Sequence, residues 1–321
     1  MTTRKLSLLK PTGQLGLGHL LGALRPMAAG QSEADCFYGI ADLHALTVRH
    51  DPAKIRSCTA EMTALLLAVG LDRSTLFVQS RVPAHSELAY LLECVATTGE
   101  LSRMIQFKEK GRGVDSTRVS LYTYPALMAA DILLYRPSEV PVGDDQRQHV
   151  ELTRDLALRF NATYGPVFTV PDIVTPATGA RVMDLADPTS KMSKSGGGTA
   201  GSIHLLDPPD VVRRKVARAV TDSDTGPGAV NADRAAKPGV TNLLEILVAC
   251  GGSGEGLATY GALKQAVTDV VITELAPIQQ RYDELVADPA YVRAVYESGA
   301  ARCREVTAPV LAAARTAIGL G

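Results

Sequence analysis

The clearest candidate for chemistry near the amino terminus is a glycine-rich turn that ends in a histidine. Residues 11–19 read Pro-Thr-Gly-Gln-Leu-Gly-Leu-Gly-His and follow a short apolar run. Glycines let the backbone approach a phosphate closely, and the amino terminus of a helix favours an anion. The spacing of Gly16, Gly18 and Gly22 nearly matches a dinucleotide fingerprint, but the third glycine is one residue late. The turn alone leaves open a phosphate site or a tight turn without a ligand.

A second candidate is the basic motif Lys191-Met192-Ser193-Lys194-Ser195, which runs into a glycine- and serine-rich stretch. Two lysines three residues apart on a flexible segment can close over a triphosphate and neutralise the charge on a departing pyrophosphate. The alternative is a solvated basic loop. The combination of the five-residue motif with a Gly-His turn far upstream favours the nucleotide interpretation.

The apolar pattern predicts the elements that position these motifs. In the first half of the chain, short apolar runs alternate with helical stretches, which is typical of a parallel sheet flanked by helices. The pattern fades after Arg181 and is helical from Pro208 onward, which predicts an all-helical second domain. The predicted strands are residues 6–9, 36–41, 75–79 and 139–143. The predicted helices are a first helix from about residue 19 and residues 53–69, 125–135, 145–160, 210–220, 242–250, 260–288 and 291–318.

Composition restricts the class of protein. The chain has 321 residues, 46% of them hydrophobic and 21% charged, which suits two globular domains. We find neither a signal-peptide pattern nor an apolar run that spans a bilayer, so we expect a cytoplasmic protein without a membrane partner. The net charge of −1 means that any RNA contact must rely on local groups of Arg and Lys. Five widely spaced cysteines favour reduced thiols over a disulfide framework or a zinc site.

With both motifs in view, the chain resembles the class I aminoacyl-tRNA synthetases. The turn ending in Gly18-His19 is similar to their H-I-G-H signature, and residues 191–195 are similar to their K-M-S-K-S signature. The resemblance implies a Rossmann-type sheet across which both motifs bind ATP and stabilise the attack of an amino acid's carboxylate on the α-phosphate. It implies catalytic roles for His19, Lys191, Lys194 and Lys110. It implies ATP binding by Lys10, Gly18, His19, Gly143, Asp145, Gln146, Met192, Ser193 and Lys194.

The middle of the chain narrows the resemblance to the tryptophanyl-tRNA synthetases. Residues 124–135 and 140–149 are very similar to this family, and further segments extend the similarity over most of the chain. An indole pocket fits these residues, because apolar side chains supply walls and Asp131 can accept the single indole N–H. A paired structural acid is the alternative for Asp131. The resemblance implies tryptophan binding by Leu6, His44, Gln106, Tyr124, Met128, Asp131, Val140, Val142 and Gln146, with Tyr124 and Gln146 at the amino group.

The resemblance also implies a domain organisation and a set of partners. It divides the α/β chain into a Rossmann-type catalytic domain at 1–187 with a helical insertion near 100–130, a lysine loop with a helical anticodon-binding domain at 188–289, and a C-terminal helix at 290–321 that returns to the catalytic domain. The implied substrates are tryptophan, ATP with Mg²⁺ and tRNA(Trp), in a homodimer without a protein-bound metal or a DNA partner. Arg213, Arg214 and Arg218 are candidate contacts for tRNA phosphate, and a solvated helix face is the alternative.

Some residues depart from the family pattern. Leu8 stands where members have glycine, Lys10 stands where they have glutamine, and Gly196-Gly197 replaces the usual Asp-Pro after the lysine motif. We hypothesise that Leu8 and Lys10 retune discrimination between tryptophan and tryptophan-like inhibitors, as a specialised inhibitor-tolerant form requires. The rival interpretations are a tyrosyl-tRNA synthetase, which needs a polar pair for the phenolic hydroxyl, and a nucleotide-binding regulatory paralogue that does not charge tRNA.

Overall fold

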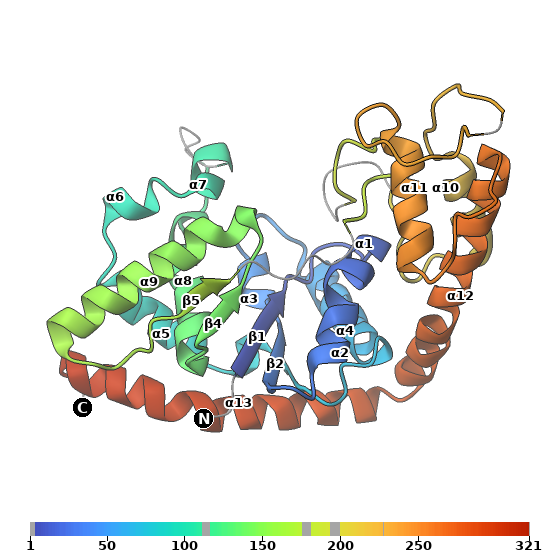
Figure 1. Ribbon diagram of the computed structural model, residues 1–321. Coiled ribbons are helices and arrows are strands. Elements are labelled where there is room, and N and C mark those ends of the chain that lie inside the picture. The colour runs from blue at the N-terminus through green and yellow to red at the C-terminus, as the bar shows by residue number, and fades with distance from the viewer. Residues whose placement is uncertain (1–3, 111–115, 175–180, 193–199, 227, 321) are drawn as a thin grey trace.

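The computed structural model describes residues 4–110, 116–174, 181–192, 200–226 and 228–320. A sheet with helices on both sides forms the middle of the molecule, and a bundle of helices stands at one end of it (Figure 1). The long C-terminal helix runs beneath the sheet and the helices beside it. None of the described helices combines the length and the apolar content that a membrane span requires.

The central sheet is parallel. Strands β1 (Arg4–Leu9), β2 (Asp35–Ile40) and β3 (Thr75–Val78) pair in the order β1-β2-β3. Strands β4 (Glu139–Pro141) and β5 (Asp172–Val174) form a second parallel pair, and β4 lies beside β1. Parallel neighbours need crossover connections, which the chain makes with helices. The predicted α/β class with a parallel sheet is therefore confirmed.

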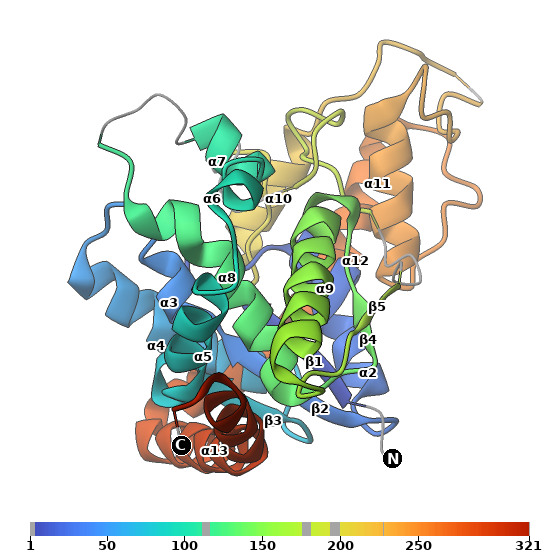
Figure 2. The same ribbon diagram turned by 90° about the vertical axis from the view of Figure 1, so that its left-hand side faces the viewer.

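Helices cover the sheet on both sides. The Gly-His turn opens into α1 (Leu17–His19), the π-helical turn η1 (Leu20–Leu24) and α2 (Arg25–Gly30). Helices α5, α8 and α9 pack together on the other side of the molecule (Figure 2). The remaining bounds in this half are α3 (Asp42–Ala45), α4 (Pro52–Ala68), η2 (Gln79–Arg81), α5 (Ala84–Glu93), α6 (Thr98–Leu101), α7 (Ile105–Lys110), α8 (Val119–Tyr135) and α9 (Asp144–Tyr164).

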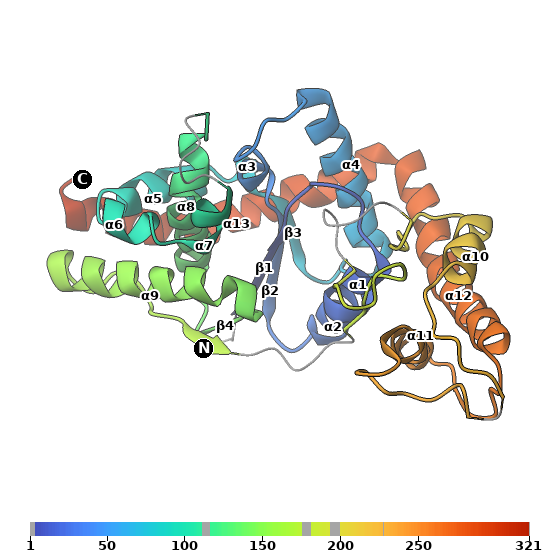
Figure 3. The same cartoon turned by 90° about the horizontal axis from the view of Figure 1, so that it is seen from above.

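The second half of the chain is helical, as predicted. Helices α10 (Pro209–Ala217), α11 (Pro238–Ala249) and α12 (Tyr260–Ala287) pack together at one end of the sheet (Figure 3). Leu243, Ile246 and Leu247 of α11 are fully or almost fully buried at helical spacing, so this stripe faces the bundle core. The bundle shares one continuous apolar core with α4 and the helices after the Gly-His turn.

The predicted strands correspond to β1, β2, β3 and β4, but strand β5 and several helices, α5 among them, were not among the predicted elements. Strand β5 has only three residues, so it shows no alternation that a pattern could reveal. Helix α5 buries Ala84, Leu88, Leu91 and Leu92 at helical spacing, so the sequence did carry a signal for it. Helix α8 begins at Val119 rather than at residue 125, because Pro125 lies inside the helix instead of at its first turn.

The C-terminal helix α13 (Pro289–Ile318) packs against β3, α5 and α8. It comes close to the sheet at Gly299, where an added Cβ atom would lie 1.8 Å from the carbonyl oxygen of Leu76. The clash would be with backbone, which cannot swing aside as a side chain would. Glycine at this position therefore sets the distance between α13 and β3.

We expect Gly299→Ala to destabilise the protein by about 2 kcal/mol or more, as overpacking in a core does. The direction of the change in stability distinguishes the two cases, because a glycine-to-alanine change in an open helix interior stabilises a protein by roughly 0.5–1 kcal/mol. Urea denaturation followed by circular dichroism measures the difference. Ser298→Ala, at the neighbouring exposed position, is the control and should change stability little. A Gly299→Ala protein as stable as the parent would contradict the close packing.

Candidate active site

A cavity of about 470 Å³ forms where the residues at and after β1, β2 and β4 meet. Strand β1 lies between β2 and β4, and ligands of open parallel sheets bind at such a point, beyond the carboxyl ends of the strands. Every residue predicted for the amino acid lines this cavity, together with two predicted for ATP. They are Leu6, Lys10, His44, Gln106, Tyr124, Met128, Asp131, Val140, Val142, Gly143 and Gln146.

Helix α8 supplies one wall of the cavity. Tyr124, Met128 and Asp131 are spaced four and three residues apart, so they lie on one face of the helix. Ile132 and Met128 pack with Val140, Val142 and Leu6 in a single apolar cluster. The cavity therefore has apolar walls from α8, β1 and β4, and it suits a flat apolar ring.

Asp131 is the charged group of this wall, and it is 3% exposed. Its Oδ1 accepts hydrogen bonds from Gln79 Nε2 at 2.7 Å and pairs with His85 Nδ1 at 2.6 Å, and its Oδ2 pairs with His44 Nε2 at 2.8 Å. Burial by itself raises the pKa of Asp131, but the hydrogen bonds and charges of His44 and His85 outweigh it and lower the pKa to about 2. Asp131 is thus a paired acid and a cavity-lining carboxylate at once.

The lowered pKa of Asp131 predicts how stability depends on pH. A carboxyl whose pKa is lower in the folded state than its usual unfolded value, about 3.9, stabilises the fold above that value. The contribution is lost as pH falls toward about 2, where the folded carboxyl takes up its proton. The difference in unfolding free energy between the parent and Asp131→Asn should therefore be constant from pH 7 to about pH 5 and shrink below about pH 4. Denaturation at stepped pH measures it, and a difference that grows with acid would refute the assignment.

Polar side chains also line the cavity. The Tyr124 hydroxyl makes a hydrogen bond with Nε2 of the buried His149, and burial raises the pKa of Tyr124. Gln106 of α7 and Gln146 of α9 line the same region, and Lys10 is exposed at its rim. The cavity thus joins an apolar compartment with one carboxylate to a polar mouth that holds amides, a phenol and a lysine.

The Gly-His turn is built against the lysine motif. His19 Nδ1 accepts a hydrogen bond from the backbone N–H of Gly16 at 3.3 Å, which places the ring proton on Nε2. The backbone N–H of Leu17 donates to the carbonyl of Ile203. An added Cβ atom at Gly18 would lie 3.3 Å from the carbonyl oxygen of Met192, so Gly18 permits this contact. The fold therefore brings the two nucleotide motifs together, although they are far apart in the sequence.

The remaining predicted residues lie around these two regions. Lys191 is exposed and forms an isolated β-bridge with Met183. Lys110 ends α7, Asp145 lies in the first turn of α9, and Ser193 and Lys194 lie outside the described residues. Within the described ranges, no group of three or more His, Cys, Asp or Glu side chains is arranged to hold a metal ion.

The arginines predicted to contact tRNA are exposed on α10 and at its carboxyl end. These residues are Arg213, Arg214 and Arg218. Lys215, on the same helix, is instead held inside the structure, where it pairs with Asp207 and donates to the carbonyl of Ser202. Lys215 therefore anchors the segment that follows the lysine motif rather than the solvent face.

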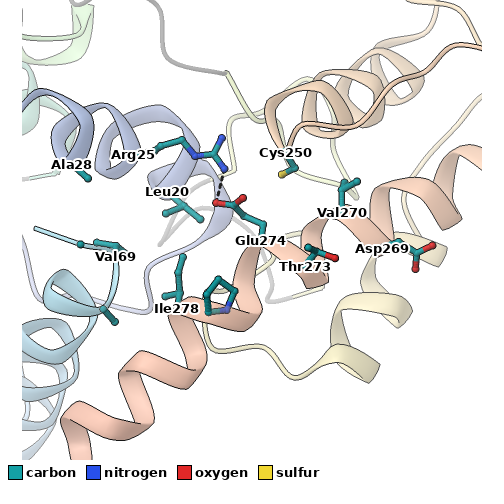
Figure 4. A pocket seen from close by; sticks show the side chains of 13 residues that line it. Leu20, Arg25, Ala28, Val69, Cys250, Asp269, Val270, Thr273, Glu274 and Ile278 are labelled. Carbon is teal, nitrogen blue, oxygen red and sulfur yellow. Dashed lines mark ion pairs between the residues drawn. The ribbon is translucent and has the colours of Figure 1, made fainter.

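A second cavity, of about 520 Å³, separates the helices after the Gly-His turn from α12 (Figure 4). Arg25 spans it, with one guanidinium nitrogen 2.5 Å from the carboxylate of Glu274 and another 2.5 Å from the carbonyl oxygen of Ala249. Figure 4 shows Arg25 pointing across the gap to Glu274. Because α2 follows the Gly-His turn directly, this contact connects the turn to the helical part of the chain.

Sequence reasoning missed several residues around Asp131. Gln79 begins η2 directly after β3, His85 lies in the first turn of α5, and Tyr135 ends α8. One signal was available, because Gln79 ends a predicted strand and His85 comes soon after it, and ligand-binding groups of parallel sheets gather at the carboxyl ends of strands. Nothing in the sequence indicated that Tyr135 takes part.

The fold and this site define the class I aminoacyl-tRNA synthetases, in which a Gly-His turn and a lysine motif meet beside a parallel sheet. The family model described as tRNA synthetases class I (W and Y) matches residues 3–277. The chain is 54% identical to Tryptophan–tRNA ligase 1 of Streptomyces avermitilis, over 97% of each protein. From this match and this relative, the chain belongs to the tryptophanyl-tRNA synthetases of that family.

Solved structures agree with the family. A crystal structure of tryptophanyl-tRNA synthetase from Mycoplasma pneumoniae is 35% identical, with a TM-score of 0.87 over 100% of this chain and 99% of that chain. The structure of the Campylobacter jejuni enzyme complexed with ADP and tryptophan is 29% identical, with a TM-score of 0.83 over 99% of this chain and 100% of that chain. The similarity therefore covers the helical part as well as the sheet.

Proposed function

We propose that this chain activates L-tryptophan with ATP and transfers it to tRNA(Trp), and that the cavity beside α8 is the amino-acid site. The observation that carries the proposal is an apolar compartment with one buried carboxylate, Asp131, in its wall. The indole ring of tryptophan has one N–H and is otherwise apolar, so its polarity matches the compartment. The family and its relatives named as tryptophan–tRNA ligases support the same activity.

The polar mouth suits the amino acid's main-chain groups and the nucleotide. We assign Tyr124 and Gln146 to the amino group, and Lys10 and Gly143, which line the same cavity, to ATP. The Gly-His turn is assigned to ATP as well. In the first step a carboxylate oxygen of tryptophan forms a bond to the α-phosphorus, and the bond to the β-phosphate oxygen breaks. Pyrophosphate leaves with the electron pair. The protein's contribution is to position the reactants and to stabilise the developing charge, with Lys191, Lys194 and His19 as the groups assigned to it.

In the second step the activated tryptophan is transferred to tRNA, and we assign tRNA binding to the part of the chain after residue 187. We assign residues 188–289 to the lysine loop and anticodon binding, with Arg213, Arg214 and Arg218 as phosphate contacts, and residues 290–321 to a helix that supports the catalytic domain. The exposure of these arginines supports this assignment. We also propose a cytoplasmic homodimer, with Mg²⁺ bound to ATP as substrate rather than held by the protein.

ATP–pyrophosphate exchange with purified protein and each amino acid in turn tests the proposal, because it measures adenylate formation independently of tRNA. We expect exchange with tryptophan alone. Exchange with tyrosine would instead favour the tyrosyl rival, for which the apolar cluster of Met128, Val140 and Val142 offers no partner to a phenolic hydroxyl. No exchange with any amino acid would favour the paralogue that does not charge tRNA.

Leu8 and Lys10 both line the cavity, which supports their proposed role in discrimination against tryptophan-like inhibitors. A lysine at the mouth adds a positive charge that favours the negatively charged carboxylate of the substrate over a neutral group in its place. We expect Lys10→Gln to bind tryptophanol, which lacks the carboxylate, about tenfold more tightly relative to tryptophan than the parent does, or about 1.4 kcal/mol.

Inhibition of pyrophosphate exchange by tryptophanol measures this effect. Lys5→Gln is the matched control, because Lys5 lies in β1, the strand that Lys10 directly follows, but pairs with Glu33 and does not line the cavity. Equal inhibition of the parent and Lys10→Gln would remove the role proposed for Lys10.

A further inference from the structure

The carboxylate of Asp131 has few acceptor positions left. Each carboxylate oxygen accepts about two hydrogen bonds in its plane. Oδ1 is engaged by Gln79 and His85, and Oδ2 by His44. Counting the contacts of the described residues, one acceptor position therefore remains, on Oδ2, and Asp131 lines the cavity. A carboxylate with a single position left can take one N–H group from a ligand.

His85 is hydrogen-bonded to Oδ1, the oxygen whose two acceptor positions are both occupied. Its own side chain does not line the cavity. Its side chain is fully buried, with Nδ1 at 2.6 Å from Asp131 and Nε2 at 3.0 Å from the Tyr135 hydroxyl. The ring also stacks on Phe77, with centroids 5.8 Å apart and planes 21° apart. These contacts fix both the position of the imidazole and the direction of its hydrogen bonds.

The ionised Asp131 carboxylate can only accept a hydrogen bond, so Nδ1 of His85 carries the ring proton and donates it to Asp131. In the neutral ring, Nε2 then accepts from the Tyr135 hydroxyl, which holds the imidazole from its other side. The Tyr135 side chain is fully buried. Tyr135 packs between Phe37 and Phe77, so it cannot easily turn away.

We propose that His85, oriented by Tyr135, is a positioning residue that keeps Oδ1 of Asp131 saturated and presents Oδ2 as the single acceptor for the ring N–H of the amino acid. This inference rests on the proposed function and extends it to residues that do not touch the substrate. An amino acid whose ring has no N–H leaves the buried Oδ2 acceptor unpaired, so its binding free energy is less favourable. Selectivity for an N–H ring is thus set by residues behind the wall of the cavity.

The test compares tryptophan with 3-benzothienylalanine, in which sulfur replaces the indole N–H at nearly the same volume. The readout is the ratio of kcat/KM for the two amino acids in pyrophosphate exchange. We expect His85→Leu to lower the parent's preference for tryptophan by about 10- to 100-fold, the range of a hydrogen bond to a charged group. The loss should lie in KM for tryptophan rather than in kcat.

Two conservative variants guard against a simple folding defect. His85→Asn keeps an N–H donor near the position of Nδ1 and should retain more of the preference than His85→Leu. Tyr135→Phe keeps the aromatic packing and removes only the hydroxyl, and it should lower the preference by less than His85→Leu does. Tyr296→Phe is the matched control, because it also removes a buried tyrosine hydroxyl, bonded to Thr63, and should leave the preference unchanged.

Equal losses with both amino acids in His85→Leu and Tyr135→Phe would overturn the inference and leave these residues a structural role only. The proposed function is tested separately, by the preference of the parent protein for tryptophan over 3-benzothienylalanine. A parent that uses tryptophan and 3-benzothienylalanine equally well would show that Asp131 does not receive the N–H. A parent that prefers tryptophan, with variants that prefer it equally, would retain the proposed site and reject the role of His85.

Discussion

Asp131→Asn is expected to lower kcat/KM for tryptophan by about 100-fold or more in pyrophosphate exchange. The substitution preserves the size of the side chain but removes the charge that three donors surround. An amide also has an N–H₂ group that faces these donors or the indole N–H, so at least one buried donor loses its partner. Buried unpaired groups and lost charged hydrogen bonds each cost about 1–3 kcal/mol, and tenfold corresponds to about 1.4 kcal/mol.

The control for this result is Asp155→Asn, the same substitution at an exposed position of α9. It should change kcat/KM little. Circular dichroism establishes that Asp131→Asn is folded at the assay temperature. An Asp131→Asn protein with the parent's kcat/KM for tryptophan would place the indole somewhere other than the compartment beside α8.

Lys191→Ala is expected to lower kcat by about 100- to 1,000-fold, while KM for tryptophan changes little. Removal of one group that stabilises transition-state charge typically costs this much. Lys191 is exposed next to Met192, which contacts Gly18 in the Gly-His turn, and it does not line the cavity proposed for the amino acid. A defect confined to kcat follows from this position, since the ground-state contacts of tryptophan remain.

Steady-state exchange at varied tryptophan and saturating ATP separates the two constants. Lys54→Ala, at an exposed position of α4, is the control for loss of a surface lysine and should behave as the parent. If Lys191→Ala instead raised KM for tryptophan at unchanged kcat, the lysine motif would contribute to amino-acid binding rather than to the chemical step.

Local spacing explains why part of the site was predictable. Tyr124, Met128 and Asp131 share a helix face through the period of the α-helix alone, so their common orientation follows from the sequence. Val140 and Val142 alternate along an extended segment in the same way. The resemblance to a family supplied which of these faces meets the substrate, and the cavity contains all of them.

Long-range contacts explain what was not predictable. His85 and Asp131 are 46 residues apart and Gln79 and Asp131 are 52 apart, and no period connects them. The close approach of α13 to β3 at Gly299 joins segments that are even more distant in the sequence. A lone glycine in a helical pattern reads as a weak position, and only the neighbouring backbone shows that any larger residue is excluded.

The sequence by itself determined the α/β class, the helical second half, the Gly-His and lysine motifs, and which side chains share the faces that line the cavity. These features depend on residue type and on short periods, which fix the direction of side chains within one element. Tertiary structure alone decided that the Gly-His turn packs on Met192 and that Asp131 keeps a single acceptor position. The physical reason is that hydrogen-bond saturation and packing distance are properties of groups from several elements, and they exist only once those elements have come together.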